Sequence, residues 1–258
     1  MHRHTANNLE FYQSDLLADT RHGIFTRHGG VSDAPFGALN VGGTVGDVVE
    51  NVHENHRLMY DVLDANAAQA CTTWQVHGAD VVMSNGPVAG RKWVARADSI
   101  ITNREGVPLV MRFADCVPLI MYDPQKRAIG LAHAGWRGTV KGVGKETVLA
   151  MKDAYGCRPE DIRVVVGPSI SIEKFQVGEE VVAAFDNHFG TTEGLMRRDP
   201  DDGTAYMDLW EANRRDLAAI GVEHIEIMGI CTASNTDDFF SHRQEKGKTG
   251  RFGVVVEL

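Results

Sequence analysis

The sequence predicts an α/β (α+β) fold, a single domain of layered mixed sheets flanked by helices. Short apolar runs bounded by turn residues alternate with segments whose apolar residues recur at helical spacing. No low-complexity linker and no internal repeat divides residues 1–258. The hydrophobic fraction of 43% is enough to build a substantial core. Residues 1–20 show no clear element and form a poorly defined N-terminal segment at this level of analysis.

Five apolar runs are predicted to form strands. Each is rich in Val, Ile or Leu, and turn residues bound most of them, as expected of buried strands. The five runs are Val107–Tyr122, Ala128–Ala132, Ile162–Val166, His224–Ile230 and Val254–Leu258.

Three helices are predicted from apolar residues that share one face. The first begins at Asp47, where Glu50 is placed to complete a capping box. The second covers Val140–Met151, directly after a glycine-rich segment. The third begins near Asp208, with Glu211 three residues further on.

Composition excludes several classes of protein. The net charge of −9 disfavours nonspecific binding to nucleic acid or to anionic membranes, although local arginines can still bind small anions. The four cysteines include no Cys-x-x-Cys pair, so we expect no disulfide framework. No apolar stretch approaches the roughly 20 residues of a spanning helix, and the N-terminus lacks a hydrophobic signal core. We expect a cytoplasmic monomer with no membrane partner.

The most informative feature is the trio His77, Cys116 and His133. Histidine and cysteine are ligands that zinc prefers, and three protein ligands leave a coordination position open for water or substrate. The intervals between the three residues are too long for a zinc finger, so the fold must bring them together from separate elements. The alternative interpretation is a buried structural cysteine and two turn histidines that satisfy backbone groups.

Glycine-rich segments with arginines mark candidate anion-binding loops. Arg27 precedes the pair Gly29-Gly30, and Arg137 follows His133 within Gly135-Trp136-Arg137-Gly138. Backbone N–H groups at a helix N-terminus, together with a guanidinium, can hold phosphate or carboxylate. Arg243 belongs to a basic, glycine-rich stretch near the C-terminus. Tight turns explain the same compositions.

An ordered set of motifs resembles one bacterial family. That family has long been called the multicopper polyphenol oxidase or laccase-domain proteins, is now regarded as purine nucleoside phosphorylases, and includes the peptidoglycan editing factor. The resemblance runs from about Gly23 to the C-terminus. It is carried by Thr26-Arg27, Gly29-Gly30-Val31-Ser32, Leu39-Asn40-Val41-Gly42, Gln75-Val76-His77-Gly78, Ala114-Asp115-Cys116-Val117-Pro118, His133-Ala134-Gly135-Trp136-Arg137-Gly138, Gly167-Pro168-Ser169-Ile170 and Phe239-Phe240-Ser241.

The resemblance implies zinc bound by His77, Cys116 and His133, which also form the catalytic centre. It implies phosphorolysis of adenosine, inosine, guanosine and methylthioadenosine, with adenosine deamination as a second activity. One departure is His242, which stands where such proteins usually carry an aromatic residue. A second is the segment 171–175, which lacks a cysteine often found there.

The two reactions place different demands on the residues. Deamination needs a nucleophilic water at purine C6, and zinc with an open position can lower the pKa of water toward about 7. Phosphorolysis needs phosphate held against the ribose anomeric carbon, a task that we assign to Arg27, Arg137 and Arg243. Asn40 is a candidate contact to the nucleoside, and Asp115 a candidate proton shuttle.

Three other functions compete with this interpretation. A copper-dependent polyphenol oxidase needs many histidines, and the only His-x-His pair here is His2 and His4. A hydrolase with a Cys116–His133 dyad is chemically reasonable and would fit editing of a peptidoglycan precursor. A zinc-stabilised module that binds a partner protein is disfavoured by the open coordination position and the clustered arginines.

Overall fold

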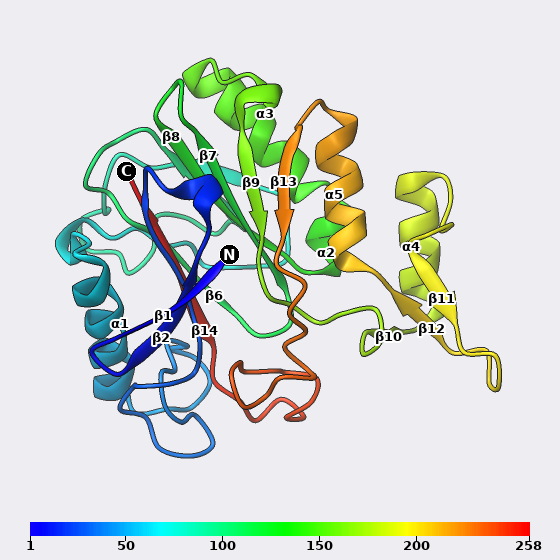
Figure 1. The fold of residues 1–258 in the computed structure, drawn as a ribbon, viewed down its shortest axis with the longest axis horizontal. Coiled ribbons are helices and arrows are strands. Elements are labelled where there is room, and N and C mark those ends of the chain that lie inside the picture. The colour runs from blue at the N-terminus through cyan, green and yellow to red at the C-terminus, as the bar shows by residue number, and fades with distance from the viewer.

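Two sheets stacked face to face form the centre of the molecule (Figure 1). The computed structural model describes residues 1–258. The first sheet is antiparallel throughout, in the order β1 (His2–Ala6), β2 (Leu9–Gln13), β3 (Arg21–Phe25), β14 (Phe252–Glu257) and β6 (Leu109–Phe113).

The second sheet has six strands and mixed directions. It is parallel at its two edges, between β13 and β9 and between β5 and β4, and antiparallel elsewhere. Its order is β13 (His224–Ile227), β9 (Arg163–Val166), β7 (Val117–Asp123), β8 (Ala128–Ala134), β5 (Ser99–Thr102) and β4 (Val81–Met83).

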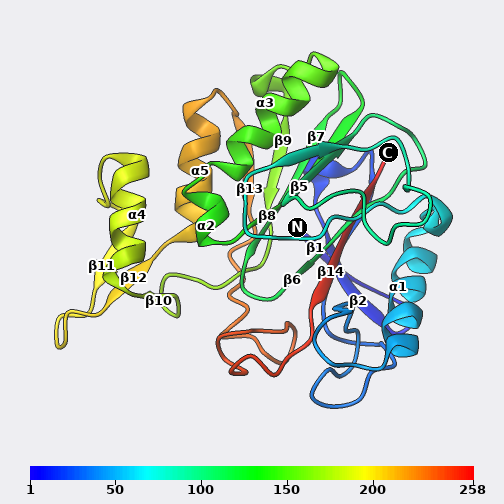
Figure 2. The ribbon, with the colours of Figure 1, turned by 180° about the vertical axis from the view of Figure 1, so that it is seen from behind.

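Helices cover the outer faces of both sheets, so that the layers run helix, sheet, sheet, helix. Behind the first sheet α1 lies beside β14, as Figure 2 shows, and α3 and α5 cover the second sheet. A small three-stranded sheet projects to one side and carries α4. The helices are α1 (Val49–Leu63), α2 (Trp136–Thr139), α3 (Val143–Tyr155), α4 (Glu179–Phe189) and α5 (Leu209–Ala219); the small sheet is β10 (Gln176–Val177), β12 (Ala205–Met207) and β11 (Met196–Arg198).

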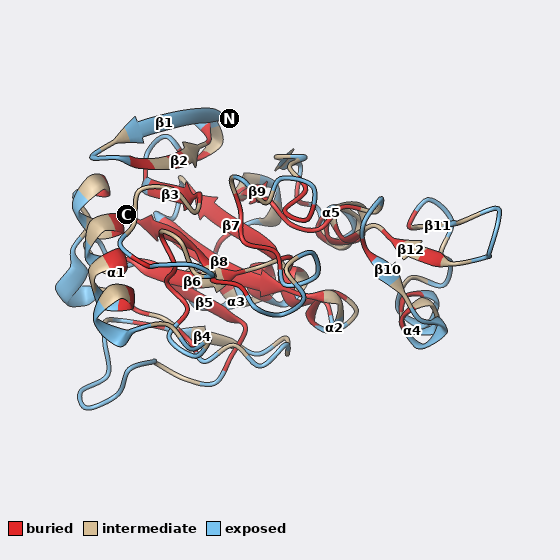
Figure 3. Ribbon diagram, turned by 90° about the horizontal axis from the view of Figure 1, so that it is seen from below, coloured by how far each residue is buried: buried red, intermediate tan, exposed pale blue.

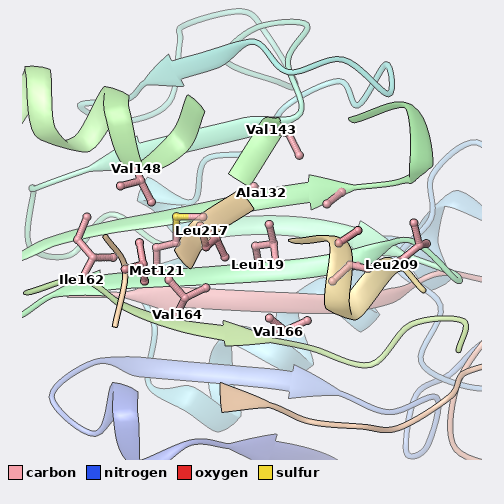
Figure 4. Close-up of a cluster of buried hydrophobic side chains, with 14 of the residues drawn as sticks. Leu119, Met121, Ala132, Val143, Val148, Ile162, Val164, Val166, Leu209 and Leu217 are labelled. Carbon is pink, nitrogen blue, oxygen red and sulfur yellow. The ribbon is translucent and has the colours of Figure 1, made fainter. Parts of the chain in front are cut away.

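Strand β7 shows why the central runs are apolar at every position. Alternate side chains of a strand point to opposite faces of its sheet. Leu119 and Met121 pack toward α3 and α5, in the cluster drawn in Figure 4, whereas Ile120 and Tyr122 pack between the two sheets. All seven residues of β7 are buried because both of its faces are covered. Figure 3 shows the contrast with β1, an exposed edge strand.

The predicted α/β class is confirmed, and most predicted elements are present with shifted ends. The run Val107–Tyr122 is instead two strands, because Asp115, with φ of 79°, turns the chain from β6 in one sheet to β7 in the other. The predicted run His224–Ile230 ends its pairing at Ile227. Residues 1–20 contain β1, β2 and a short 3₁₀ turn, Asp15–Leu17.

The helix predictions differ from the structure at two N-termini. The capping box at Asp47 is wrong: α1 begins one residue after Val48, and the Asp47 carboxylate accepts hydrogen bonds from Ser32 (2.6 Å) and Asn40 (2.8 Å). The second helix is split, because Gly142, with φ of 74°, separates α2 from α3. None of the five helices is both long and apolar enough to cross a bilayer.

Candidate metal centre and cavity

Three segments far apart in the sequence bring His77, Cys116 and His133 together. Cys116 lies in the turn that crosses from β6 to β7, His133 is in β8, and His77 lies in the loop before β4. One nitrogen or sulfur atom from each residue lies within 4.8 Å of the other two. The Cys116 Sγ is 4.0 Å from the His77 Nε2, and the two imidazole rings meet edge to face at 4.9 Å. This is a possible metal-binding group.

Asp98 fixes both histidines from behind. Its carboxylate, fully buried, bonds His133 Nδ1 at 2.8 Å, which leaves Nε2 of that ring for the trio. It also accepts the backbone N–H groups of Val76, His77 and Gly78 at 2.7–3.0 Å. A carboxylate that orients a ligand histidine through its second ring nitrogen is a recurrent feature of metal sites. Sequence analysis missed Asp98, whose only signal is an acid directly before an apolar strand.

Gly135 leaves the space that the trio needs. A Cβ at this position would lie 2.9 Å from the Cys116 Sγ and 3.0 Å from the His77 Cδ2. Any other residue would therefore push the side chains of the trio apart. Together with the soft donor set and the carboxylate of Asp98, this clearance fits the residues to a bound metal ion.

The two histidines of the trio lower the pKa of the Cys116 thiol. Burial would raise the pKa of the Cys116 thiol, but the charge and hydrogen bond of His133, followed by those of His77, bring that pKa down to about 6. For His133 burial opposes protonation, and the neighbouring Cys116 sulfur and Asp98 raise its pKa. Cys116 thus favours the thiolate, which is the form that binds metals and attacks electrophiles.

A cavity of about 890 Å³ opens beside the trio and extends toward α1. Its charged walls carry Lys92, Arg112, Arg243 and Arg251 against one acid, Asp115. Two tryptophans stand at its wall, Trp74 and Trp93, with ring centroids 5.0 Å apart and exposed fractions of 39% and 38%.

Of the predicted anion-binding arginines, only Arg243 lines this cavity. Its guanidinium lies 5.5 Å from the ring of Phe175, and Nη1 donates to the carbonyl of Gln176 at 2.9 Å. Its backbone N–H donates to Asp115 at 2.7 Å.

The structure places Arg27, Asn40 and Arg137 outside the cavity lining. Arg27 lies over the Phe240 ring and donates to the carbonyls of residues 37 and 236 and to a glutamate. Asn40 is fully buried, and its Oδ1 accepts the backbone N–H of Arg251 at 2.8 Å. Arg137 is exposed and stacks on Trp136 at 4.3 Å, on a helix of only four residues.

Asp115 clamps the loops around the trio. One carboxylate oxygen accepts from Thr232 and Ser241, both at 2.7 Å, and the other accepts from the backbone of Arg243. All of these partners come from the C-terminal loops, more than a hundred residues away in the sequence. The three hydrogen bonds hold the β6–β7 turn, and with it Cys116, in place.

A second group of potential ligands, Glu10, His28 and Asp238, is occupied by protein. Arg3 donates to both carboxylates, and His28 Nε2 lies 2.8 Å from Asp238 Oδ1. This group is an ion-pair network that ties the N-terminal hairpin to the C-terminal loop.

Arg112 and Arg251 are cavity residues that sequence analysis missed. Arg112 is inside the run Val107–Tyr122, where a cation within an apolar stretch is the available signal. Arg251 lies in the basic, glycine-rich stretch near the C-terminus that follows Arg243.

The chain is similar to known proteins in both sequence and fold. The sequence model of the family described as multi-copper polyphenol oxidoreductase laccase matches residues 21–258. A purine nucleoside phosphorylase of Deinococcus radiodurans is 38% identical, over 98% of this chain and 95% of its own length. One from Bacteroides thetaiotaomicron is 34% identical, over 96% of each chain. The crystal structure of YlmD from Geobacillus stearothermophilus matches with a TM-score of 0.89 at 32% identity, covering 98% of this chain and 97% of that one.

Proposed function

This chain belongs to the multi-copper polyphenol oxidoreductase laccase family, and from that membership we propose a purine nucleoside phosphorylase centred on zinc at His77, Cys116 and His133. Its proposed substrates are adenosine, inosine, guanosine and methylthioadenosine, each with phosphate. The relatives that carry the name purine nucleoside phosphorylase support the enzyme class.

One observation carries the proposal: a single cavity joins the trio to walls suited to a nucleoside. Trp74 and Trp93 offer faces on which a purine can stack. Two buried polar atoms on the wall, His56 Nδ1 and Thr72 Oγ1, lack a protein partner and can bond the hydroxyl or N–H groups of such a ligand. Burial, followed by the charge of Arg112, lowers the pKa of His56 to about 4, so this ring is neutral.

Phosphorolysis replaces the bond between the ribose and the purine with a bond between the ribose and phosphate. A phosphate oxygen forms a bond to C1′ as the C1′–N9 bond breaks, and the bonding electrons leave with the purine, which takes up a proton. Positive charge develops on the sugar, so a nearby anion and fixed dipoles stabilise the transition state. When bound, zinc would supply a Lewis acid that polarises a substrate atom or activates water. Asp98 keeps His133 in the tautomer and orientation that such binding needs.

Adenosine deamination is proposed as a second activity of the same centre. The observation that favours it is the exposure of His77, which leaves the trio open to the cavity on one side. A zinc ion held by His77, Cys116 and His133 would supply an activated water on the side that faces the cavity.

A hydrolase is the second candidate, because Asp98, His133 and Cys116 also have the order of a nucleophilic triad. The acid bonds one nitrogen of the imidazole, whose other nitrogen faces the thiol. This candidate would accommodate editing of a peptidoglycan precursor. Copper oxidase chemistry is disfavoured, since His2 and His4 lie on the exposed strand β1 and belong to neither ligand group.

The proposed working form is a monomer in the cytoplasm. All four cysteines are free thiols, which suits a reducing compartment.

A nucleoside assay tests the function. Purified protein is incubated with each of the four nucleosides, with and without phosphate, and the products are separated by chromatography. We expect adenine from adenosine only with phosphate, and inosine from adenosine in both conditions. Failure to release a base from any nucleoside would reject the phosphorylase.

Metal analysis separates zinc chemistry from the triad. We expect about one zinc per chain in the wild type and strong loss in Cys116→Ser. Inosine formation or hydrolysis that survives complete removal of zinc would return Cys116 to the role of nucleophile.

A further inference from the structure

The charge on the cavity wall is opposite in sign to the net charge of the molecule. The chain carries a net charge of −9, yet the cavity wall has four cationic side chains and one acidic side chain. Walls of one sign around a low-dielectric cleft concentrate ligands of the opposite sign. The cavity is therefore built to attract an anion, and the question is which groups hold it.

Arg112 is a half-buried cation that forms no salt bridge. Its Nη2 donates to the carbonyl of Thr73 at 2.7 Å, and its Nε and Nη2 donate to Gln75 Oε1 at 3.3 and 3.1 Å. Both partners are neutral. Burial lowers the pKa of Arg112. A buried charge without a partner is costly unless a ligand completes it.

Arg251 lies in the lining of the same cavity, is half-buried and also forms no salt bridge. Its Nη1 donates only to the carbonyls of Thr249 (3.1 Å) and Gly250 (2.8 Å), and burial lowers its pKa. The acidic groups that face it are Cys116, Asp115 and Glu245, and none of them forms a salt bridge with it. Asp115 holds three donors, as described above. Glu245 accepts from Arg27, Ser241 and Thr249.

The segments that carry the two arginines are neighbours in the first sheet. In the antiparallel pair of β6 and β14, Arg112 lies opposite Gly253. Arg251 directly precedes β14 and stands two residues before Gly253. Diagonal neighbours across such a pair are within reach of long side chains. Both side chains line the same cavity, so an anion bound there would meet positive charge from both segments.

Thr73 supplies an independent sign of a ligand at this wall. The residue is fully buried and lines the cavity, and its Oγ1 has no hydrogen-bond partner. Its carbonyl is one of the two acceptors that orient Arg112. A buried hydroxyl beside an uncompensated guanidinium is a donor with nothing in the protein to bond.

We propose that Arg112 and Arg251, with the Thr73 hydroxyl, form the phosphate subsite of this cavity. Guanidinium groups match the tetrahedral oxyanion with paired N–H donors, and the threonine hydroxyl adds another. The subsite replaces the assignment of phosphate to Arg27 and Arg137. Its use for a co-substrate rests on the proposed phosphorylase function; the anion site itself does not.

Binding measured without turnover tests the subsite. Inorganic phosphate is titrated into zinc-loaded protein, at constant ionic strength set with chloride, and followed by calorimetry and by the melting temperature. A parallel arm uses adenosine 5′-monophosphate. A response to inorganic phosphate supports a subsite for the free ion, and a response to the monophosphate alone supports one for a phosphate ester. A response to neither overturns the proposal.

Variants assign the response to the two arginines. Arg112→Gln and Arg251→Gln should each weaken phosphate binding by about tenfold or more, since each removes charge-assisted hydrogen bonds. Arg112→Lys and Arg251→Lys keep the charge and should recover part of the binding. The matched control is Arg104→Ala, an exposed arginine outside the cavity. Circular dichroism and melting in phosphate-free buffer verify that each variant is folded.

The outcomes separate the subsite from the function. Phosphate binding that depends on both arginines, in a protein that cleaves no nucleoside, would keep the subsite and reject the phosphorylase. Nucleoside cleavage with an unchanged KM for phosphate in both Gln variants would keep the phosphorylase and reject the subsite. If Arg137→Ala abolishes phosphate binding while Arg112→Gln does not, the sequence-based assignment is right and this proposal is wrong.

Discussion

At the scale of single residues, the site depends on side chains that are not themselves metal ligands. Asp98 fixes His133 and the backbone of the His77 loop, and Asp115 fixes the turn that carries Cys116. Both carboxylates are buried and accept several hydrogen bonds. The geometry of the trio is therefore set by Asp98 and Asp115, which hold the three residues in place without being ligands themselves.

Replacing Asp98 should weaken metal binding more than it unfolds the protein. In Asp98→Asn the amide still accepts some of the backbone N–H groups but no longer presents a charge to His133. We expect zinc affinity to fall by about 10–100-fold, as for other partners of metal-ligand histidines. Competition with a chromophoric chelator measures it, with Asp153→Asn, exposed on α3, as the control. Equal affinities would show that Asp98 serves folding alone.

Cys116 should be the reactive thiol of metal-free protein. Its pKa of about 6 lies below the ordinary value, so the thiolate forms as the pH rises through about 6 and predominates at pH 7. The alkylation rate with iodoacetamide should rise over that interval and fall when zinc is added back. Burial raises the pKa of Cys71 and of Cys157, which should react slowly throughout. Mass mapping of the labelled peptides distinguishes these thiols.

At the scale of elements, helix starts decide where the sequence patterns succeed and fail. Asp208 caps α5 through the N–H groups of Trp210 (2.9 Å) and Glu211 (3.0 Å). At α1 the similar pattern fails, because Asp47 is drawn away to bond Ser32 and Asn40. The same kind of residue thus serves a helix in one place and a loop in the other, according to its tertiary neighbours.

The two helix starts supply a matched pair of variants. Asp208→Ala should lower the free energy of unfolding by about 1 kcal/mol, since two N–H groups lose their acceptor. Glu50→Ala, at the first turn of α1 where no capping box forms, should change it by less than about 0.5 kcal/mol. Urea unfolding followed by circular dichroism measures both. A larger loss in Glu50→Ala would mean that the predicted capping box forms in solution.

At the scale of the whole molecule, the site lies where the layers meet. The chain passes from the first sheet to the second between β6 and β7, and Cys116 sits at that crossing. His133 belongs to the second sheet, and the wall with Arg112 belongs to the first. A metal ion at the trio would link segments that are otherwise joined only through packing and hydrogen bonds.

Removing the metal should therefore destabilise the entire fold. A ligand that binds only the folded state stabilises it by about 2.7 kcal/mol at a free concentration of 100 times Kd. We expect chelator-treated protein to melt at a lower temperature, and added zinc to restore the wild-type value. Cys116→Ser should show a much smaller zinc response in the same calorimetric scan. Identical melting curves with and without zinc would show that the trio binds no metal.

The sequence by itself determined the fold class, the central strands and the candidate ligands. Runs such as Ile162–Val166 are apolar because both faces of their strands are covered, and that pattern is local. His77, Cys116 and His133 have side chains whose chemistry points to a metal before any geometry is known. Their motifs also carried the resemblance to the family, which the match over residues 21–258 supports.

Only the tertiary structure decided which residues surround those ligands. In the sequence Asp98 and Arg112 differ from their neighbours only as charges in or beside apolar strands. Their burial and their hydrogen-bond partners depend on contacts between distant segments. Arg137 had the more suggestive motif, yet its side chain is exposed and stacks on Trp136 outside the cavity lining. A sequence motif indicates which chemistry its residues can perform. Whether a side chain points into the cavity depends on how the two sheets pack and on the turn that joins β6 to β7.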